Sequence, residues 1–486
     1  MTSARLKNNV EYYRDPAVIA RVLEFYGGWR GGQPVPGSRY CIGFGESELW
    51  KGNEKAYWSS TSREQIFEMS QEKGLDVFAS LWRDDGTVLA LDIEYFNLTY
   101  PGEAHAHPIR TFAKLEPVYR IIREIFDRYG LKLLITMTGQ GYHFTALWPF
   151  EKEHQLLEGI GALEDNTVKK YRYRKFKVGG ETPLCVGKAF SGACRLLQYL
   201  SHQVVIECDR RREAGERIVP VVYSDIPIGP DGQGIYGDGQ EAVSLDLTLY
   251  SDPVYARSIR IPFSTYQKHK VMRWKVGEVL ARRTPISTCV CRWWPGAKRE
   301  MSWEELLRIR RREDGRHFDL TAEYAEKVST RLPREVEGWK EVLRDYLSSE
   351  LFRFHREFDQ CYYTSRKGPD FDFDAVIRDM PPCFSRALQN PNDILLKPVF
   401  LQGIVRVLEK KGWHPKDIGY LIYLKYRSMK RWGYLSPEKL AYFWVELYCG
   451  ALRAGADTKY DLNCISQQER SLCWVRNCGF NLRDYL

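Results

Sequence analysis

The chain has 486 residues, of which 44% are hydrophobic and 14% aromatic, which is typical of a folded protein with two or three domains and excludes a disordered one. Its 72 basic and 63 acidic residues give a net charge of +9, which mildly favours polyanionic partners. The opening MTSARLKNNVEYYRD contains no apolar signal core, and no run of about 18 apolar residues occurs anywhere. We therefore expect a cytoplasmic protein without a membrane segment.

The segment from residue 75 to 150 predicts strands around one long helix. DVFASLW and TVLALDIEYF are apolar runs on either side of the turn RDDG, which predicts a β-hairpin. The span from Thr111 to Tyr129 has apolar residues at helical spacing and ends at Gly130, which suits a helix C-terminus. The apolar strand LKLLITMT follows. These elements predict a domain that mixes helices and strands.

Helical patterns dominate the second half of the chain. Residues 150 to 240 predict short strands and an extended loop, whereas MSWEELLRIRRRE and PREVEGWKEVLRDYLSSELFRFHREF predict helices. SRKGPDFDFD interrupts these helices with Gly, Pro and acidic residues. We predict an α+β fold in three parts: a mixed-sheet domain at 1–285, a helical linker domain at 286–370 and a helical domain at 371–486.

Two carboxylates stand two positions apart in the apolar stretch LALDIEYFN. In a strand, Asp92 and Glu94 point to the same face, roughly 7 Å apart along its surface. Like charges at this spacing repel, and a divalent cation bound through oxygen ligands would offset the repulsion. The alternative is a solvated strand face with two exposed acids. The apolar run before Asp92 favours the metal site.

Two downstream segments supply residues that suit phosphate binding. LLITMT runs into GQGYHF, where glycines allow close approach of a ligand and nearby groups suit an anion, namely Thr138, Gly139, Gly141 and His143. Taken alone, this segment is better explained as a turn beside a structural histidine. SLDLTLYSDPVYARSIRIPFSTYQKHK adds a third acid, Asp246, and phosphate donors at Arg257, Arg260, Ser264 and Lys268. Three acids beside a basic cradle are the parts of a two-metal nucleotidyl-transfer site.

These segments together resemble the archaeo-eukaryotic primase superfamily, which includes primase-polymerases. Asp92 and Glu94 match its Asp-x-Asp/Glu motif, TGQGYH matches Ser-Gly-x-Gly-x-His, and RIPFSTYQK matches an Arg-x-Pro-x-Ser segment ending in lysine. The resemblance implies that Asp92, Glu94 and Asp246 hold two Mg²⁺ or Mn²⁺ ions, with Asp252 and Asp225 as weaker claimants for the third position. It also implies that His143, Arg260 and Lys268 grip phosphates. Tyr266 departs from the family, which often has histidine there.

A set of cysteines closes the chain. TKYDLNCISQQERSLCWVRNC spaces three of them as C-x8-C-x4-C, and MPPCFSRAL supplies a fourth upstream. Such thiolates suit zinc or a [4Fe–4S] cluster, and buried core cysteines are the alternative. The surrounding sequence motifs, including Pro-Pro-Cys and Tyr-x-x-x-Cys, resemble those of the iron-sulfur C-terminal domain of the primase large subunit. That resemblance implies a [4Fe–4S] cluster on Cys383, Cys464, Cys473 and Cys478, with Cys449 as a spare buried thiol.

Weaker signals remain between and beyond these motifs. A zinc site is one reading of Cys185, Cys194, His202 and Cys208, but SGACRLLQYL also reads as an amphipathic helix that buries Cys194. His105 and His107 follow the first motif and suit a metal or a plain surface loop. Cys289 and Cys291 read as structural residues. The aromatic and basic stretch YLIYLKYRSMKRWGYL suits either single-stranded nucleic acid or a helix with a solvated basic face.

The two resemblances imply a single-chain primase or primase-polymerase that makes short RNA or DNA on single-stranded DNA. The first domain would transfer nucleotides, and the iron-sulfur domain would hold template and the initiating triphosphate. The implied partners are single-stranded DNA, NTPs or dNTPs and a replicative helicase. The alternatives are a non-catalytic protein that binds primer-template junctions and a repair polymerase that only extends existing ends.

Overall fold

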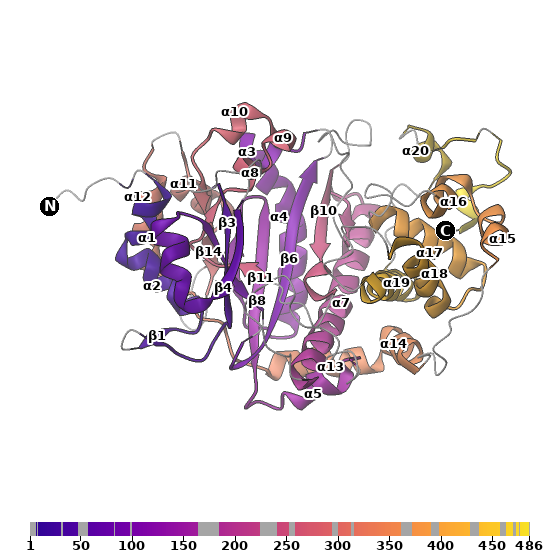
Figure 1. The fold of residues 1–486 in the computed structure, drawn as a ribbon, viewed down its shortest axis with the longest axis horizontal. Coiled ribbons are helices and arrows are strands. Elements are labelled where there is room, and N and C mark those ends of the chain that lie inside the picture. Colours follow the sequence, from indigo (N-terminus) through magenta and orange to yellow (C-terminus); the bar gives the residue numbers. More distant parts are fainter. Residues whose placement is uncertain are drawn as a thin grey trace.

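In the computed structural model of the chain, the described residues are 6, 8–30, 33–46, 57–81, 83–97, 100–163, 184–223, 241–251, 258–293, 300–312, 315–360, 372–389, 398–427, 437–456, 463–469, 473–475 and 477–485. They form a mixed α+β structure, as the sequence predicts. Figure 1 shows the β-sheets toward the amino-terminal end of the molecule and a group of helices at the opposite end. Among the described helices, none combines the length and apolar character needed to cross a bilayer.

A six-stranded mixed sheet forms the centre of the first half, in the order β14-β7-β8-β6-β10-β9. Its strands, in chain order, are β6 (Gly86–Asn97), β7 (Leu134–Met137), β8 (Gly141–Pro149), β9 (Val221–Val222), β10 (Glu241–Asp246) and β14 (Cys289–Arg292). β6 is the longest of these strands, and it pairs antiparallel with β8 on one side and with β10 on the other. The sheet therefore places two distant segments of the chain directly beside β6.

A second sheet has four strands in the order β11-β5-β3-β4. They are β3 (Tyr40–Gly45), β4 (Tyr57–Ser62), β5 (Asp76–Ser80) and β11 (Ser258–Arg260). The predicted hairpin between DVFASLW and TVLALDIEYF is wrong, because β5 pairs with β3 and β11 whereas β6 belongs to the six-stranded sheet. The RDDG segment thus joins two sheets instead of two paired strands, a distinction that local turn residues do not encode.

The long helix α4 (Pro108–Arg128) links β6 to β7, and it begins three residues before the predicted span. Gly130 follows it at a φ of 63°, as its predicted place at the helix end requires. β8 then runs antiparallel to β7 and lies between β7 and β6. The crossover through α4 therefore connects two strands that are not adjacent in the sheet. The tight connection from β7 to β8 contains Thr138, Gly139 and Gln140.

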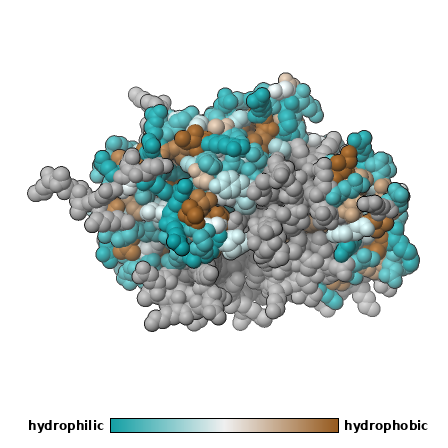
Figure 2. Space-filling view, turned by 90° about the horizontal axis from the view of Figure 1, so that it is seen from above, coloured by the Kyte–Doolittle hydropathy of each residue, from teal (hydrophilic) through white to brown (hydrophobic). Residues whose placement is uncertain are grey.

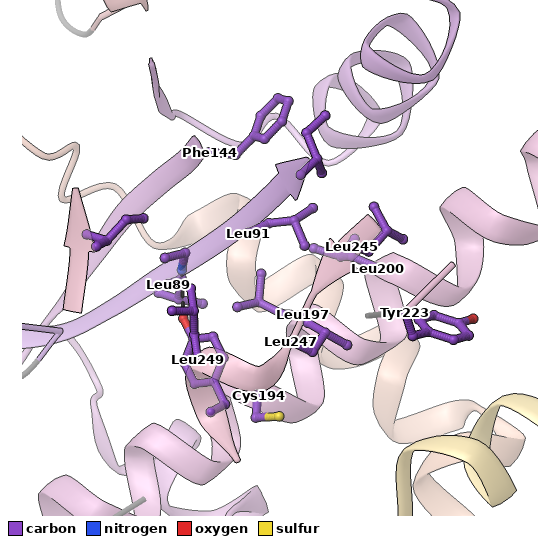
Figure 3. Close-up of a cluster of buried hydrophobic side chains, with 14 of the residues drawn as sticks. Leu89, Leu91, Phe144, Cys194, Leu197, Leu200, Tyr223, Leu245, Leu247 and Leu249 are labelled. Carbon is purple, nitrogen blue, oxygen red and sulfur yellow. Dashed lines mark hydrogen bonds between the residues drawn. The ribbon is translucent and has the colours of Figure 1, made fainter. Parts of the chain in front are cut away.

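Two helices cover one face of the six-stranded sheet. α4 contacts β8 through Tyr119 and Phe126, whose rings lie 5.7 and 5.6 Å from the ring of Phe144. α7 (Leu184–Glu213) packs against β6. Figure 3 shows Leu89, Leu91 and Leu245 from the sheet among side chains of α7 such as Leu197 and Leu200. Burial of this apolar face fixes which side of each strand points to the helices.

Smaller elements surround the two sheets. β1 (Trp29–Arg30) pairs with β2 (Gln33–Pro34), and β12 (Thr265–Tyr266) pairs with β13 (Ile286–Ser287). The short helical segments in this half are α1 (Asn9–Arg14), α2 (Pro16–Phe25), η1 (Arg63–Gln65), η2 (Glu68–Glu72), α3 (Glu103–Ala106), α5 (Gln155–Ile160), η3 (Thr248–Tyr250), α8 (Lys268–Val271), α9 (Arg273–Val276) and α10 (Glu278–Ala281). Figure 2 views the molecule from above, and its coloured residues are mostly hydrophilic, with hydrophobic residues in separate small groups.

The first domain extends beyond the predicted boundary at residue 285. β14 forms the edge of the six-stranded sheet by pairing with β7, and β13 pairs with β12. α11 (Trp303–Ile309) packs on α4, and α12 (His317–Ala325) packs on α1 and α2. The described residues between 286 and 325 are therefore part of the sheet region, because their strands and helices complete its layers.

The remaining helices lie toward the carboxyl end. They are α13 (Glu337–Ser348), α14 (Glu350–Gln360), α15 (Phe373–Arg378), α16 (Pro382–Gln389), α17 (Pro398–Lys410), α18 (Pro415–Tyr426), α19 (Pro437–Arg453), α20 (Cys464–Glu469) and η4 (Leu482–Tyr485). α19 packs against α14, α17 and α18, and α13 packs against α7. This half is helical in its described residues, as predicted.

A buried ion network joins α7 to the helical half. The Arg195 guanidinium donates to both carboxylate oxygens of Asp359 on α14 at 2.7 Å, and its Nε lies 3.5 Å from Glu446 on α19. His355 lies 3.3 Å from the same Glu446 carboxylate and 2.7 Å from the Tyr346 hydroxyl. Arg195 is almost fully buried, whereas Asp359 and Glu446 stay partly exposed, so the two acids compensate a guanidinium that packing has removed from water.

We expect Arg195→Ala to lower the free energy of unfolding by about 3 kcal/mol, because Asp359 and Glu446 would lose their shared cation. The measurement is the urea midpoint followed by circular dichroism. Arg210→Ala is the control on the same helix, since Arg210 pairs with Glu207 at an exposed position and should leave the urea midpoint almost unchanged. Equal losses in the two variants would contradict a role for Arg195 between the two halves.

Candidate active site and cysteine cluster

The polar face of the six-stranded sheet carries a row of three predicted site residues. Asp92 on β6 is the direct partner of His143 on β8 and of Asp246 on β10. Directly opposed residues of antiparallel strands lie about 5 Å apart at their Cα atoms and point to the same face. The structure thus brings together one residue from each of the three motifs. The Nε2 atom of His143 lies 3.5 Å from Oδ1 of Asp92.

Strand alternation adds Glu94 to this face. Leu91 and Ile93 are buried on the opposite side, so Asp92 and Glu94 point away from α4 and α7. Both acids are half-buried, unlike the fully exposed pair that a solvated strand face would give. The prediction that the two carboxylates share one surface is therefore confirmed by the strand geometry.

Glu94 has two donors around its carboxylate. Lys268 Nζ lies 3.1 and 3.0 Å from the two oxygens, and Gln140 Nε2 donates to Oε2 at 3.0 Å. Lys268 is the first residue of α8, which follows the RIPFSTYQ segment. The third motif therefore reaches the first through an ion pair. Asp246 is also engaged, since its Oδ1 accepts from the backbone and hydroxyl of Thr248 at 2.8 and 2.5 Å.

Arg260 on β11 lies near the same face from the second sheet. Its guanidinium stacks between the rings of Phe78 and Tyr266, 4.4 and 4.5 Å from their centroids, and donates to the Thr265 carbonyl at 2.6 Å. It also forms an ion pair with Asp76, which is completely buried. Burial raises the pKa of Asp76, while the Arg260 charge lowers it. These contacts fix Arg260 in one orientation.

Sequence reasoning missed Asp76. It opens the apolar strand DVFAS, and an acid in the first position of a buried strand is the one signal that marked it. Asp76 also accepts from the Thr265 hydroxyl at 2.7 Å and from the Gln267 backbone at 2.8 Å. Its role is to hold the Arg260 to Gln267 segment in place.

The predicted phosphate contact of Ser264 is not supported by its position. Ser264 is fully buried, and its hydroxyl accepts from the Val77 amide at 2.8 Å and donates to the Thr265 carbonyl at 3.1 Å. The adjacent Phe263 has a φ of 63°, a conformation that costs about 1 kcal/mol or more for a side chain of this kind. Ser264 therefore stabilises a tight turn and does not face a ligand. Arg257, Asp252 and Asp225 lie outside the described residues.

The connection between β7 and β8 is shaped by close packing. A Cβ on Gly141 would lie 1.7 Å from the Ile93 carbonyl oxygen, and a Cβ on Gly139 would lie 2.3 Å from the Tyr266 ring. The Thr138 amide donates to the Gly141 carbonyl at 2.8 Å. Both glycines are thus required by the structure of the chain itself. Phosphate binding by Thr138 and this loop stays a prediction.

His143 is buried, with both cations and acids nearby. Burial and then the charge of Arg260 lower the pKa of His143 to about 4, and the charge of Glu94 opposes them. The imidazole is therefore neutral at pH 7 and keeps one N–H for donation. The same group of charges reaches Tyr266, whose pKa is raised to about 12 by burial.

The donor types on this face fit a divalent cation, although their present contacts are with protein donors. Asp92, Glu94 and Asp246 supply carboxylate oxygens, which Mg²⁺ and Mn²⁺ prefer. Among the described residues, however, no set of three or more His, Cys, Asp or Glu side chains converges as a ready metal site. Lys268 and Thr248 engage two of the acids, so binding of an ion requires these carboxylates to turn toward it.

The four predicted cluster cysteines lie in one region of the helical half. The pKa of Cys383 is raised to about 12, mainly by burial and also by the neighbouring thiols of Cys473, Cys464 and Cys478. Cys383 lies in the first turn of α16, and Cys464 opens α20. The described thiols do not converge as ligands of a single ion. A four-iron cluster needs its thiols further apart than one zinc ion does, because each thiolate binds a different iron.

Cys449 is the cysteine that was left out of the predicted cluster as a spare buried thiol. It is fully buried in α19, where burial and then Glu409 raise its pKa. Cys289 and Cys291 are buried in the edge strand β14, which agrees with a structural role.

The structure does not bring together the four residues of the weaker zinc prediction. Cys185, Cys194, His202 and Cys208 all lie on the single helix α7. At a rise of about 1.5 Å per residue, the first and last of them stand roughly 34 Å apart, so they have no common metal position. Cys194, His202 and Cys208 face the core, in keeping with the alternative of an amphipathic helix.

The aromatic and basic stretch forms part of α18 up to Tyr426, and positions 428–436 lie outside the described residues. Leu421 and Ile422 face the core, and Lys425 lies over the Phe373 ring, 3.1 Å from its centroid. The described part therefore packs as an amphipathic helix, and nucleic-acid binding by it stays a prediction.

Comparisons of the chain with protein-family models, with curated proteins and with solved structures gave no match. The candidate site is thus defined by the residues and geometry of this chain alone.

His202 tests whether α7 buries this histidine in the core instead of using it as a zinc ligand. Burial lowers the pKa of His202 to about 3, whereas an unfolded chain has a His pKa of about 6.5. Between these two pKa values, only the unfolded chain protonates His202. The contribution of His202 to the free energy of unfolding is therefore complete above pH 6.5 and is lost as the pH falls toward 3. We expect His202→Leu to reduce the loss of unfolding free energy between pH 7.5 and pH 5 by about 2 kcal/mol. Urea unfolding at both pH values measures it. An unchanged pH dependence, or a zinc ion that the variant no longer retains, would contradict this reading.

Proposed function

We propose that this protein is a primase-type nucleotidyltransferase that synthesises short RNA or DNA on a single-stranded DNA template. The observation that carries the proposal is the row of His143, Asp92 and Asp246 across β8, β6 and β10. Glu94 shares its face, and Lys268 and Arg260 bring positive charge toward it. Acids for metal ions beside cations for a triphosphate are what nucleotidyl transfer requires.

The residues of this face divide the work by charge. Asp92, Glu94 and Asp246 would hold divalent ions, which lower the pKa of an attacking 3′-hydroxyl and neutralise the triphosphate. Lys268 is the mobile partner, because its ammonium already pairs with Glu94 and can transfer to a phosphate oxygen. Arg260 is held by Asp76 and aromatic rings, so it offers a fixed positive charge. Neutral His143 beside Asp92 can donate one hydrogen bond to a phosphate oxygen.

The helical half would carry a [4Fe–4S] cluster on Cys383, Cys464, Cys473 and Cys478. The proximity of the other three thiols to Cys383 supports the assignment. In this proposal the cluster stabilises the end of the chain, and the surrounding helices hold template and the triphosphate of the initiating nucleotide. Single-stranded DNA, NTPs or dNTPs and a replicative helicase are the corresponding partners.

We expect Asp92→Asn and Asp246→Asn each to lower metal-dependent nucleotide incorporation by roughly a hundredfold or more, because each removes a charged ligand from the row. Incorporation is measured on single-stranded DNA with NTPs or dNTPs, with and without a primer. Glu341→Gln, on the exposed surface of α13, is the control and should retain activity.

The reactions with and without a primer distinguish the alternative functions. Synthesis only from a primer would indicate a polymerase that extends existing ends. Binding to primer-template DNA without incorporation would indicate a non-catalytic protein. Full activity in a folded Asp92→Asn variant would contradict the proposed site.

We expect Cys478→Ser to lose bound iron and sulfide together with the broad visible absorbance of the cluster, because one of the four thiolates would be missing. Iron analysis of anaerobically purified protein measures this loss. Cys185→Ser, at an exposed position on α7, is the control and should retain the metal. Wild-type protein containing zinc and no iron would contradict the assignment.

A further inference from the structure

A cavity of about 820 Å³ lies beside the β7 to β8 connection, where Gly139 forms part of its wall. It is enclosed by α3, the start of α4, the segment from α10 to β13, and α11 with the residues that follow it. Six arginines line it, namely Arg282, Arg283, Arg308, Arg310, Arg311 and Arg312. Glu304 is the one acid among the described lining residues. The cavity is therefore strongly positive.

Arg310 gives the cavity a buried donor. It is 4% exposed, and its Nη2 donates to the Thr138 carbonyl at 2.8 Å. Its Nε and Nη1 atoms are buried without a hydrogen-bond partner among the described residues. A buried guanidinium with open N–H groups is costly unless an anion satisfies them. Phosphate oxygens match the planar fork of these donors.

Two neutral histidines lie beside these arginines. His105 lines the cavity, and its ring lies 5.0 Å from that of His269. Burial and then the neighbouring His269 and Arg312 lower the pKa of His105 well below its usual value. Arg283 donates to the His105 carbonyl at 2.8 Å, which fixes one arginine at the wall. The cavity therefore has a rigid, electropositive side.

Tyr266 lies near residues of both the cavity and the candidate active site. Its ring centroid is 4.5 Å from the Arg260 guanidinium and 5.7 Å from the His105 ring. The same ring packs against Gly139. The cavity is therefore a neighbour of the candidate active site and not part of the row of carboxylates.

We propose that this cavity binds the polyphosphate group of a nucleoside triphosphate. Its volume lies within the range of about 300–1,000 Å³ found for small-molecule sites. Trp303 and Ile109 supply apolar surface for a base beside the arginines. A polyphosphate bound to Arg310 would act on the Thr138 to Gly141 loop, because Arg310 also donates to the Thr138 carbonyl. The proposal does not rest on nucleotidyl transfer, since the arginines bind phosphate without a metal.

Isothermal titration of the full chain with inorganic triphosphate and with ATP tests this site, in low salt and with EDTA to remove divalent ions. The variant is Arg282→Glu/Arg308→Glu, which reverses two exposed arginines of the cavity wall. We expect both ligands to bind the wild type, more weakly as salt rises, and the variant to bind at least about tenfold more weakly. Arg316→Glu, an exposed arginine just beyond these residues, is the control and should bind as the wild type does.

Three outcomes would overturn the proposal. They are no binding of either ligand to the wild type in EDTA, equal binding by the wild type and the double variant, and equal weakening by the Arg316 control. A fourth arm uses a single-stranded oligonucleotide without terminal phosphates. If the double variant weakens oligonucleotide binding and leaves triphosphate binding unchanged, the cavity serves a nucleic-acid backbone instead. Circular dichroism of each variant establishes that it is folded.

Discussion

The antiparallel register of β6 with its two neighbours is the constraint on which the candidate site depends. It sets His143, Asp92 and Asp246 in one row, although they come from three separate parts of the chain. A slip of one residue would turn each side chain to the opposite face, where α4 and α7 pack. Burial of Leu91 and Ile93 against those helices therefore fixes the acids on the open face. The hydrophobic effect positions the polar chemistry.

Charge compensation is built around this row from two directions. Lys268 comes from the helix after the third motif and pairs with Glu94, whereas Arg260 comes from the second sheet and is held by Asp76. The two sheets are thus joined at the place where like charges gather. Near Tyr266, an arginine-lined cavity continues the positive potential. The arrangement concentrates negative charge on one strand and surrounds it with cations that anionic ligands can share.

The helical half is attached to this region by a buried cation. Arg195 projects from the helix that covers the main sheet and is shared by Asp359 and Glu446 on two helices of the other half. Such a network is specific, because a lost partner leaves a charge buried without compensation. The cysteine cluster lies within the helices that follow, so its region and the candidate active site belong to one connected structure.

Local periodicity and motifs were enough to predict the α+β character, the span of α4, the shared face of Asp92 and Glu94, and the group of cysteines around Cys383. Packing between distant segments sets three other features: β5 and β6 lie in different sheets, Ser264 is buried, and α7 holds its cysteines and His202 too far apart for one ion. Asp76 and Arg310 also stayed hidden in the sequence. Each acts on residues far along the chain, and such contacts are set by sheet pairing and packing, which residue patterns within one segment do not encode.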